Sequence, residues 1–197
     1  MYIHHMMRKL PAIALCLLFA VNATAQMQTI TEADIKFRLP NDRWHLYSSN
    51  IDEYPHVYTY KRAPIIDKSH REVIPNISFI IENVPDTADV VVYSAYKREH
   101  LGFSVADAFS ALSNPGLLKH QYAIGFRGSY TDSKNLSHTI YYVIYIHKGK
   151  AVQLVCDVTA ELFAACKSDF DAVIRSVANI SPYENDGTLT QETIRMK

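Results

Sequence analysis

Two cysteines late in the chain have types and spacing that could support chemistry. We expect Cys156 in a strand and Cys166 on the helix that returns over it, at nearly matching heights along the two elements. A disulfide between them is therefore open, because both side chains could face the strand–helix interface. The alternative is a pair of buried free thiols that act as small apolar side chains. No histidine lies near either cysteine in the sequence, so we expect no catalytic thiol.

The histidines and the usual catalytic motifs predict no active site. Seven histidines follow residue 25, and they lack the short-spaced pairs and the His-Glu-x-x-His pattern of zinc sites. The chain has no Gly-x-Ser-x-Gly elbow, no Ser-x-x-Lys with a later Lys-Thr-Gly, and no glycine-rich phosphate loop. We therefore expect no enzyme activity, no metal and no cofactor. A pair of carboxylates that meets only in space stays open, because spacing along the chain does not reveal it.

Tyrosines are the remaining candidates for a functional surface, since the chain contains 13 of them. A tyrosine joins a large apolar ring to a polar hydroxyl and is therefore frequent at protein interfaces. The same residue is also favoured within strands for its packing alone. Where they are exposed, we expect interface residues among the tyrosines of the predicted strands, namely Tyr58, Tyr60, Tyr141 and Tyr145.

The composition is that of a globular domain. Of the 197 residues, 48% are hydrophobic and 20% are charged, which is too apolar for a disordered chain. Lys plus Arg equals Asp plus Glu at 20 each. The chain thus lacks the strong net positive charge that binding to nucleic acid relies on, and we expect no nucleic-acid partner.

The first 25 residues resemble an export signal. Two basic residues at 8 and 9 precede an apolar run at 10–21, and Ala-Thr-Ala at 23–25 supplies the small-x-small pattern of a cleavage site before Gln26. The apolar run is shorter than the roughly 20 residues that span a bilayer. A lipoprotein anchor at Cys16 is disfavoured, because Leu15 stands where a lipoprotein signal needs a small residue.

We therefore expect three segments: a signal peptide at 1–25, a single domain at 26–180 and a polar C-terminal tail at 181–197. No apolar stretch after the signal approaches membrane-spanning length. The mature chain is accordingly expected to be exported, periplasmic or secreted, without stable insertion in a membrane.

Short alternating segments predict an antiparallel sheet. We expect strands at about 34–39, 44–47, 56–62, 76–82, 119–128, 137–147 and 151–157. The loops between the last three are too short for a parallel crossover, so these strands must run antiparallel. The segment 140–146 is apolar at both odd and even positions, which is typical of a central strand covered on both faces.

Three helices are expected between and after these strands. The first runs over 87–100 with Thr87 as its N-cap, and a short second one runs over 104–112, where Ser104 and Asp107 form a capping-box-like pair. Thr159 caps the third, whose apolar residues recur at helical spacing. The predicted fold class is α+β: an antiparallel sheet of six to seven strands with helices on both faces, an α/β/α sandwich.

Two stretches of this sequence resemble the PsbP-like superfamily, which includes photosystem-associated lumenal proteins, Ran-binding proteins of the Mog type and small exported bacterial proteins. The first is FRLPNDRWHLYSS at 37–49, and the second is AVQLVCDVTAELFAACKSDFDAVIRSV at 151–177. The resemblance implies this sandwich fold and a role as an accessory or binding module without catalysis. It carries no catalytic residues to this chain.

The expected function is therefore a non-catalytic binding or accessory module of the bacterial cell envelope, with an unknown protein or envelope partner. The alternative is a hydrolase-like or ligand-modifying enzyme whose site is assembled from residues far apart in the sequence.

Overall fold

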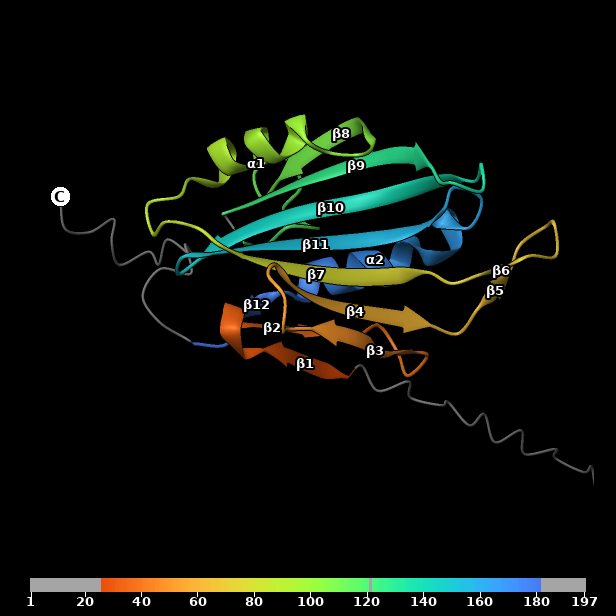
Figure 1. The fold of residues 1–197 in the computed structure, drawn as a ribbon, viewed down its shortest axis with the longest axis horizontal. Helices are drawn as coiled ribbons and strands as arrows, with labels where there is room; N and C mark the ends of the chain where they lie inside the picture. The colour runs from red at the N-terminus through yellow and green to blue at the C-terminus, as the bar shows by residue number, and fades with distance from the viewer. Residues whose placement is uncertain (1–25, 121, 182–197) are drawn as a thin grey trace, which may run out of the picture.

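A seven-stranded antiparallel sheet forms the centre of the molecule (Figure 1). The computed structural model describes residues 26–120 and 122–181, so the predicted signal peptide and nearly all of the predicted tail lie outside the described residues. The strand order is β3-β4-β7-β11-β10-β9-β8. In chain order, the strands are β3 (Trp44–Asn50), β4 (His56–Arg62), β7 (Asn76–Asn83), β8 (Ser104–Ser110), β9 (Ala123–Thr131), β10 (Ser137–His147) and β11 (Lys150–Thr159).

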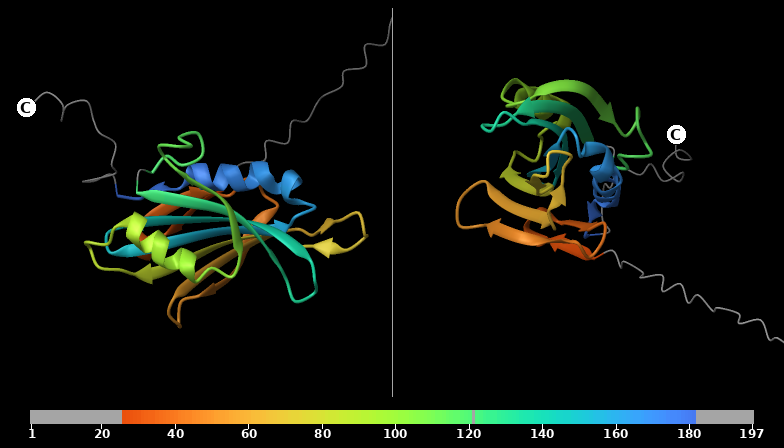
Figure 2. Two further views of the ribbon diagram at one scale, coloured as in Figure 1. Left: turned by 90° about the horizontal axis from the view of Figure 1, so that it is seen from above. Right: turned by 90° about the vertical axis from the view of Figure 1, so that its right-hand side faces the viewer.

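Two layers cover this sheet, one on each face (Figure 2). Helix α1 (Val90–Glu99) lies on one face, and helix α2 (Phe163–Ser176) lies on the other. The predicted fold class, an antiparallel sheet with helices on both faces, is confirmed. Beside the main sheet, β5 (Ile65–Ile66) and β6 (Glu72–Val73) pair as a small hairpin.

A small second sheet shares the α2 side of the molecule. It has the order β1-β2-β12, with β1 (Met27–Ile30), β2 (Ile35–Arg38) and β12 (Ala178–Asn179), and a 3-10 turn (Thr31–Ala33) joins β1 to β2. The strand expected at 34–39 therefore exists but belongs to this sheet rather than to the main one. Its ladder with β12 joins the beginning of the described chain to its end.

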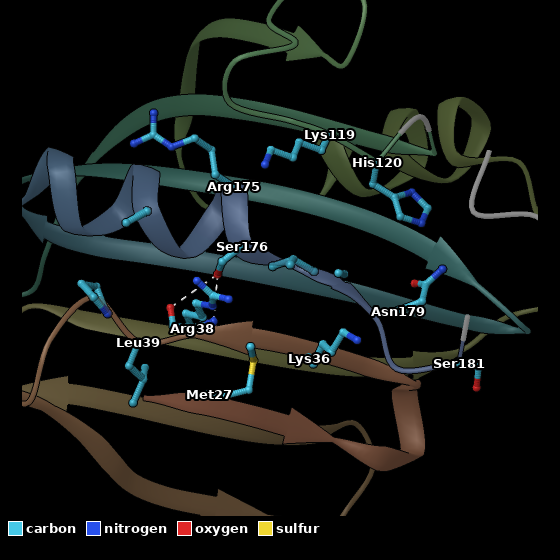
Figure 3. Close-up of a pocket in the computed structure, with 14 residues that line it drawn as sticks. Met27, Lys36, Arg38, Leu39, Lys119, His120, Arg175, Ser176, Asn179 and Ser181 are labelled. Atoms are coloured by element: carbon cyan, nitrogen blue, oxygen red, sulfur yellow. Dashed lines mark hydrogen bonds between the residues drawn. The ribbon is translucent and has the colours of Figure 1, made fainter. Parts of the chain in front are cut away.

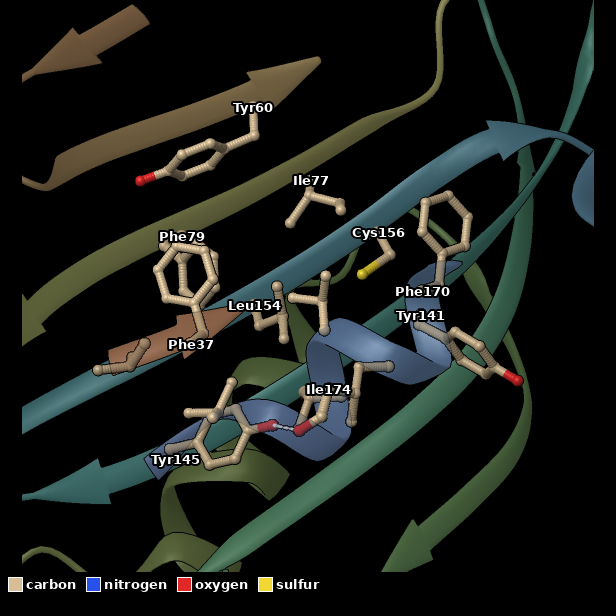
Figure 4. Close-up of a cluster of buried hydrophobic side chains, with 14 of the residues drawn as sticks. Phe37, Tyr60, Ile77, Phe79, Tyr141, Tyr145, Leu154, Cys156, Phe170 and Ile174 are labelled. Atoms are coloured by element: carbon tan, nitrogen blue, oxygen red, sulfur yellow. Dashed lines mark hydrogen bonds between the residues drawn. The ribbon is translucent and has the colours of Figure 1, made fainter. Parts of the chain in front are cut away.

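The larger core lies between the main sheet and the α2 layer (Figure 4). The rings of Phe37 and Phe79 stack with centroids 4.2 Å apart, and this contact packs the small sheet against β7. Phe170 and Ile174 of α2 are also fully or almost fully buried. Burial of a large apolar side chain contributes about 1.5–3 kcal/mol. This core contains most of the buried apolar side chains, so it contributes most of the stabilisation that comes from their burial.

The strand β10 is buried on both faces, as its doubly apolar pattern predicts. Every residue from Ile140 to Tyr145 is at most 7% exposed. Tyr142 and Ile144 contact the α1 layer, whereas Val143 and Tyr145 lie in the larger core. Successive side chains of a strand point to opposite faces, so this one segment supplies the centre of both cores.

The first residues of two helices differ from the prediction. Asp89, not Thr87, caps α1, because its carboxylate accepts two backbone N–H groups of the first turn. Helix α2 begins at Phe163 rather than just after Thr159. Thr159 is still paired with His138 at the end of β11, and its buried hydroxyl has no hydrogen-bond partner among the described residues.

The helix predicted at 104–112 is wrong, because this segment forms the edge strand β8. Two glycines in the neighbouring β9 explain the strand. A side chain at Gly125 would overlap the ring of Phe109, and one at Gly128 would overlap the ring of Phe103. The two phenylalanines therefore fill the space above and below β9 that its glycines leave open, a packing that stabilises glycine-containing sheets.

We predict that Gly125→Ala destabilises the protein by about 1–3 kcal/mol, because the added methyl group displaces the Phe109 ring from a filled core. Gly102→Ala is the matched control, since nothing lies within 4 Å of the position that its methyl group would take. Urea unfolding monitored by tryptophan fluorescence gives both values. An equal midpoint for Gly125→Ala and the wild type would show that the ring does not need this space.

Candidate functional site

A pocket of about 790 Å³ opens where the C-terminal end of α2 meets the small sheet and the segment before β9 (Figure 3). We call it the cationic pocket. Its apolar lining includes Met27, Leu39, Val177 and Ala178. Its polar lining residues are Lys36, Arg38, Lys119, His120, Arg175, Ser176, Asn179 and Ser181.

Four side chains of this pocket carry a permanent positive charge: Lys36, Arg38, Lys119 and Arg175. No Asp or Glu is among the described residues that line it. Within the described ranges, none of the ion pairs includes any of the four. Other basic side chains, such as Arg62, Lys97 and Lys148, do pair with a carboxylate, so the pocket gathers cations that lack such a partner in the described part of the chain.

The alternation of β2 presents two of these cations to the pocket. Ile35 and Phe37 point into the core and are buried, so Lys36 and Arg38 point the other way. A hydrogen bond fixes the strand against α2, because the backbone N–H of Arg38 donates to Ser176 Oγ at 2.9 Å. The same hydroxyl donates to the carbonyl oxygen of Val173 at 2.8 Å.

Sequence reasoning missed these four residues. The alternation of Lys36 and Arg38 with apolar residues predicts a strand with one exposed face, and two cations on that face are the only local signal of the pocket. Lys119 and Arg175 are far away in the sequence and reach the pocket only through the fold.

Asp34 fixes one end of the pocket. Its Oδ1 accepts from the backbone N–H of Ser181 at 3.1 Å and from the Ser181 hydroxyl at 2.8 Å. Its Oδ2 lies 2.8 Å from Lys148 Nζ and 3.1 Å from His147 Nε2. Burial alone would raise the pKa of Asp34, but the hydrogen bonds from Lys148, Ser181 and His147 outweigh it and hold the pKa well below its usual range.

The structure holds Cys156 and Cys166 as free thiols, the second of the two alternatives for this pair. Both are buried, and burial is the largest cause that raises the pKa of each thiol. Because α2 begins at Phe163, Cys166 lies in its first turn rather than six residues along it. Buried protonated thiols also make poor nucleophiles.

The four tyrosines chosen as interface candidates lie mainly inside the protein. Tyr60, Tyr141 and Tyr145 are 2%, 5% and 3% exposed, so they do not meet the condition of exposure to which the interface prediction was restricted. Tyr58 is half-buried and donates its hydroxyl to Glu32 at 2.8 Å. Burial first, and then Glu32, raises the pKa of Tyr58 to about 12. These residues pack the sheet, which is the other reason why tyrosine is favoured in strands.

One histidine lies in a polar cluster on the α1 face of the sheet. His138 Nδ1 is 2.9 Å from Asp157 Oδ1, and Tyr130 donates its hydroxyl to Asp157 Oδ2 at 2.9 Å. In a Ser-His-Asp triad, the other ring nitrogen of the histidine faces the nucleophile. Here the nearest partner of His138 Nε2 is a second carboxylate, that of Asp132, at 3.6 Å. Among the described residues, no group of three or more His, Cys, Asp or Glu side chains could hold a metal ion.

We predict that Asp34→Asn lowers the free energy of unfolding by about 1–3 kcal/mol at pH 7, because it removes the charge that Lys148 and His147 contact. Asparagine tolerates the positive φ of 52° at this position, so the backbone is preserved.

The pH dependence of the free energy of unfolding checks that the carboxylate of Asp34 is responsible for this stabilisation. Its pKa is lower in the folded state than in the unfolded chain, where it is about 3.9, so its stabilisation is present above that pH and is lost as the pH falls through the folded pKa. Urea unfolding of the wild type and Asp34→Asn should thus differ less at pH 3 than at pH 7. A difference that grows on acidification would contradict this role.

We predict that both thiols of the folded mature chain resist alkylation, because their side chains are buried and protonated. Iodoacetamide should leave the intact mass unchanged under native conditions and add two adducts once the chain is denatured without reductant. A denatured chain that gains these adducts only after reduction would instead contain a disulfide.

Comparison with known proteins identifies the fold. No protein-family model matches the chain, and no curated protein sequence matches it. Among the described residues, there is no helix with the length and apolar character needed to cross a membrane.

Three solved structures are similar to the chain at a level that shows the fold. LpqN of Mycobacterium tuberculosis, involved in cell envelope biogenesis, is 17% identical with a TM-score of 0.51, over 73% of this chain and 82% of LpqN. The Ran-binding protein Mog1p of Saccharomyces cerevisiae is 8% identical with a TM-score of 0.53, over 81% and 97%. The cyanobacterial PsbP (CyanoP) of Synechocystis sp. PCC 6803 is 15% identical with a TM-score of 0.52, over 80% and 93%. The chain therefore has the fold that LpqN, Mog1p and the cyanobacterial PsbP share.

Proposed function

We propose that this protein is an exported, non-catalytic binding module that serves as an accessory protein of the cell envelope, and that it binds an anionic partner in the cationic pocket. The observation that carries the proposal is the set of four cations that line one pocket without a carboxylate among them. The signal-like segment at 1–25 supports export. The similarity in fold to LpqN, a protein involved in cell envelope biogenesis, supports the compartment.

The electrostatics of the pocket favour an anionic partner. Like charges gathered at one pocket repel each other, and an anion placed among them removes this repulsion. Each exposed ion pair contributes only about 0–1 kcal/mol, so binding depends on several of the four cations acting together. At physiological ionic strength the attraction extends over about 8 Å, which draws an anionic partner toward the pocket.

The hydroxyls of the pocket support binding rather than the alternative of a hydrolase-like enzyme. A serine nucleophile must pass its proton to a base during attack. Ser176 donates to the backbone carbonyl of Val173, and Ser181 donates to the carboxylate of Asp34, which is already held by Lys148. Both hydroxyls are thus used in fixing the walls of the pocket.

We predict that the double variant Arg38→Glu/Lys119→Glu loses the envelope component that the wild-type mature chain retains. Both side chains are exposed, so the variant should keep the wild-type urea midpoint while the net charge of the four basic positions falls from +4 to zero. The experiment immobilises each purified chain, applies envelope extract from the native host and identifies the retained components by mass spectrometry.

The matched control is Lys68→Glu/Lys134→Glu, which makes the same change in net charge at two exposed lysines outside the pocket. The control should retain the same components as the wild type. Equal retention by the pocket variant and the control would rule out the cationic pocket as the binding site.

A further inference from the structure

We propose that the cationic pocket recognises an extended acidic segment of a partner protein, with carboxylates at alternate positions. This inference rests on the proposed function and adds the chemistry and the conformation of the ligand. Three features of the pocket lead to it: the placement of its cations, their spacing along β2 and the helix end that lies beside them.

The cations lie on two sides of the pocket rather than around one point. Figure 3 shows Lys36 and Arg38 on the side of the small sheet, Lys119 and Arg175 on the opposite side, and Ser176 between the two sides. A ligand that satisfies both sides must itself carry several separated charges. Arginine offers a planar fork that fits a carboxylate in a bidentate manner, and each side of the pocket includes one arginine.

The spacing on β2 matches that of an extended peptide. Lys36 and Arg38 are two residues apart on one strand, which places their Cα atoms about 7 Å apart on the same face. An extended segment repeats its side chains on one face at the same distance. Carboxylates at alternate positions of the ligand can therefore meet both cations at once, whereas adjacent carboxylates point to opposite sides.

The end of α2 disfavours a compact phosphate at the same place. Compact anions are typically bound at helix N-termini, where free N–H groups point toward the ligand. This pocket instead adjoins the C-terminal end of α2, where Arg175 and Ser176 form the last residues of the helix and the dipole is negative. A dense charge near the last carbonyls is therefore disfavoured relative to separate carboxylates that pair with the surrounding side chains.

The remaining lining suits a peptide as well. Met27, Val177 and Ala178 give the pocket an apolar part that can contact the aliphatic side chains between the carboxylates. A volume of about 790 Å³ falls within the range of about 300–1,000 Å³ that is usual for ligand pockets. The pocket thus combines a charge pattern with contact area, as a peptide-binding site requires.

The test uses the mature chain and two blocked, fluorescein-labelled peptides of one composition. The alternating probe is Thr-Glu-Thr-Glu-Thr, and its isomer Thr-Thr-Glu-Glu-Thr has only adjacent carboxylates. We expect the alternating probe to bind roughly fivefold more tightly by fluorescence anisotropy, since more of its carboxylates reach a cation. Binding should weaken between about 50 and about 200 mM salt, because these pairs are exposed. Arg38→Glu/Lys119→Glu should abolish binding, and Lys68→Glu/Lys134→Glu should preserve it.

Three results would overturn the inference. Equal affinity for the two isomers would mean that only net charge is recognised. Displacement of the alternating probe by tripolyphosphate at concentrations below those of unlabelled probe would identify a compact phosphate ligand. Binding to phosphatidylglycerol vesicles, with no binding of either peptide, would identify a lipid surface.

The proposed function is judged separately by the envelope experiment. If the pocket variant loses the retained component while the alternating peptide fails to bind, the pocket is a binding site for another anion, and only the acidic segment is rejected. If the pocket variant and its control retain the same component, the proposed function itself fails.

Discussion

Strands β10 and β11 carry apolar side chains on both faces, so neither face of the sheet can be left exposed to water. This constraint determines the arrangement of the other elements. Helix α1 covers one face, and α2 together with the small sheet covers the other. The outermost strands β3 and β8 each contain a bulge, which disrupts the regular ladder at both edges and disfavours further strand pairing.

The cationic pocket exists because two different elements, α2 and the small sheet, together cover this face of the main sheet. A helix and a small sheet meet there at an angle that leaves a hollow between them, and side chains that point away from the core line this hollow. The strand β12 pairs with β2, and Asp34 binds Ser181, so the two ends of the described chain are fixed on this side. The pocket thus lies on a rigid frame even though its charged side chains reach into solvent.

Local sequence patterns predicted the elements whose burial is regular. They failed where contacts with residues far away in the sequence determine the local structure. The bounds of β4 follow from alternation, and those of β10 follow from a run that is apolar at both odd and even positions. Ser104 and Asp107 resemble a helix start, yet the glycine at 125 in a neighbouring strand makes that segment a strand. The pocket could not be predicted, because Lys119 and Arg175 come together only after the sheet and α2 have packed. The sequence could not tell which tyrosines are exposed, because an apolar ring on a strand suits the core as well as an interface.

The two covers differ greatly in how firmly they are attached. Of the residues in α1, only Val90 and Ser94 are buried, and polar bonds from Tyr93 and Lys97 to Glu82 supply much of its attachment to the sheet. Detachment of α1 alone therefore costs far less free energy than unfolding of the opposite layer. We therefore expect the backbone amides of α1 to exchange with solvent through this partial opening, ahead of those in β10. The first apolar surface that the native protein exposes is accordingly the one beneath α1, on the side of the sheet away from the cationic pocket.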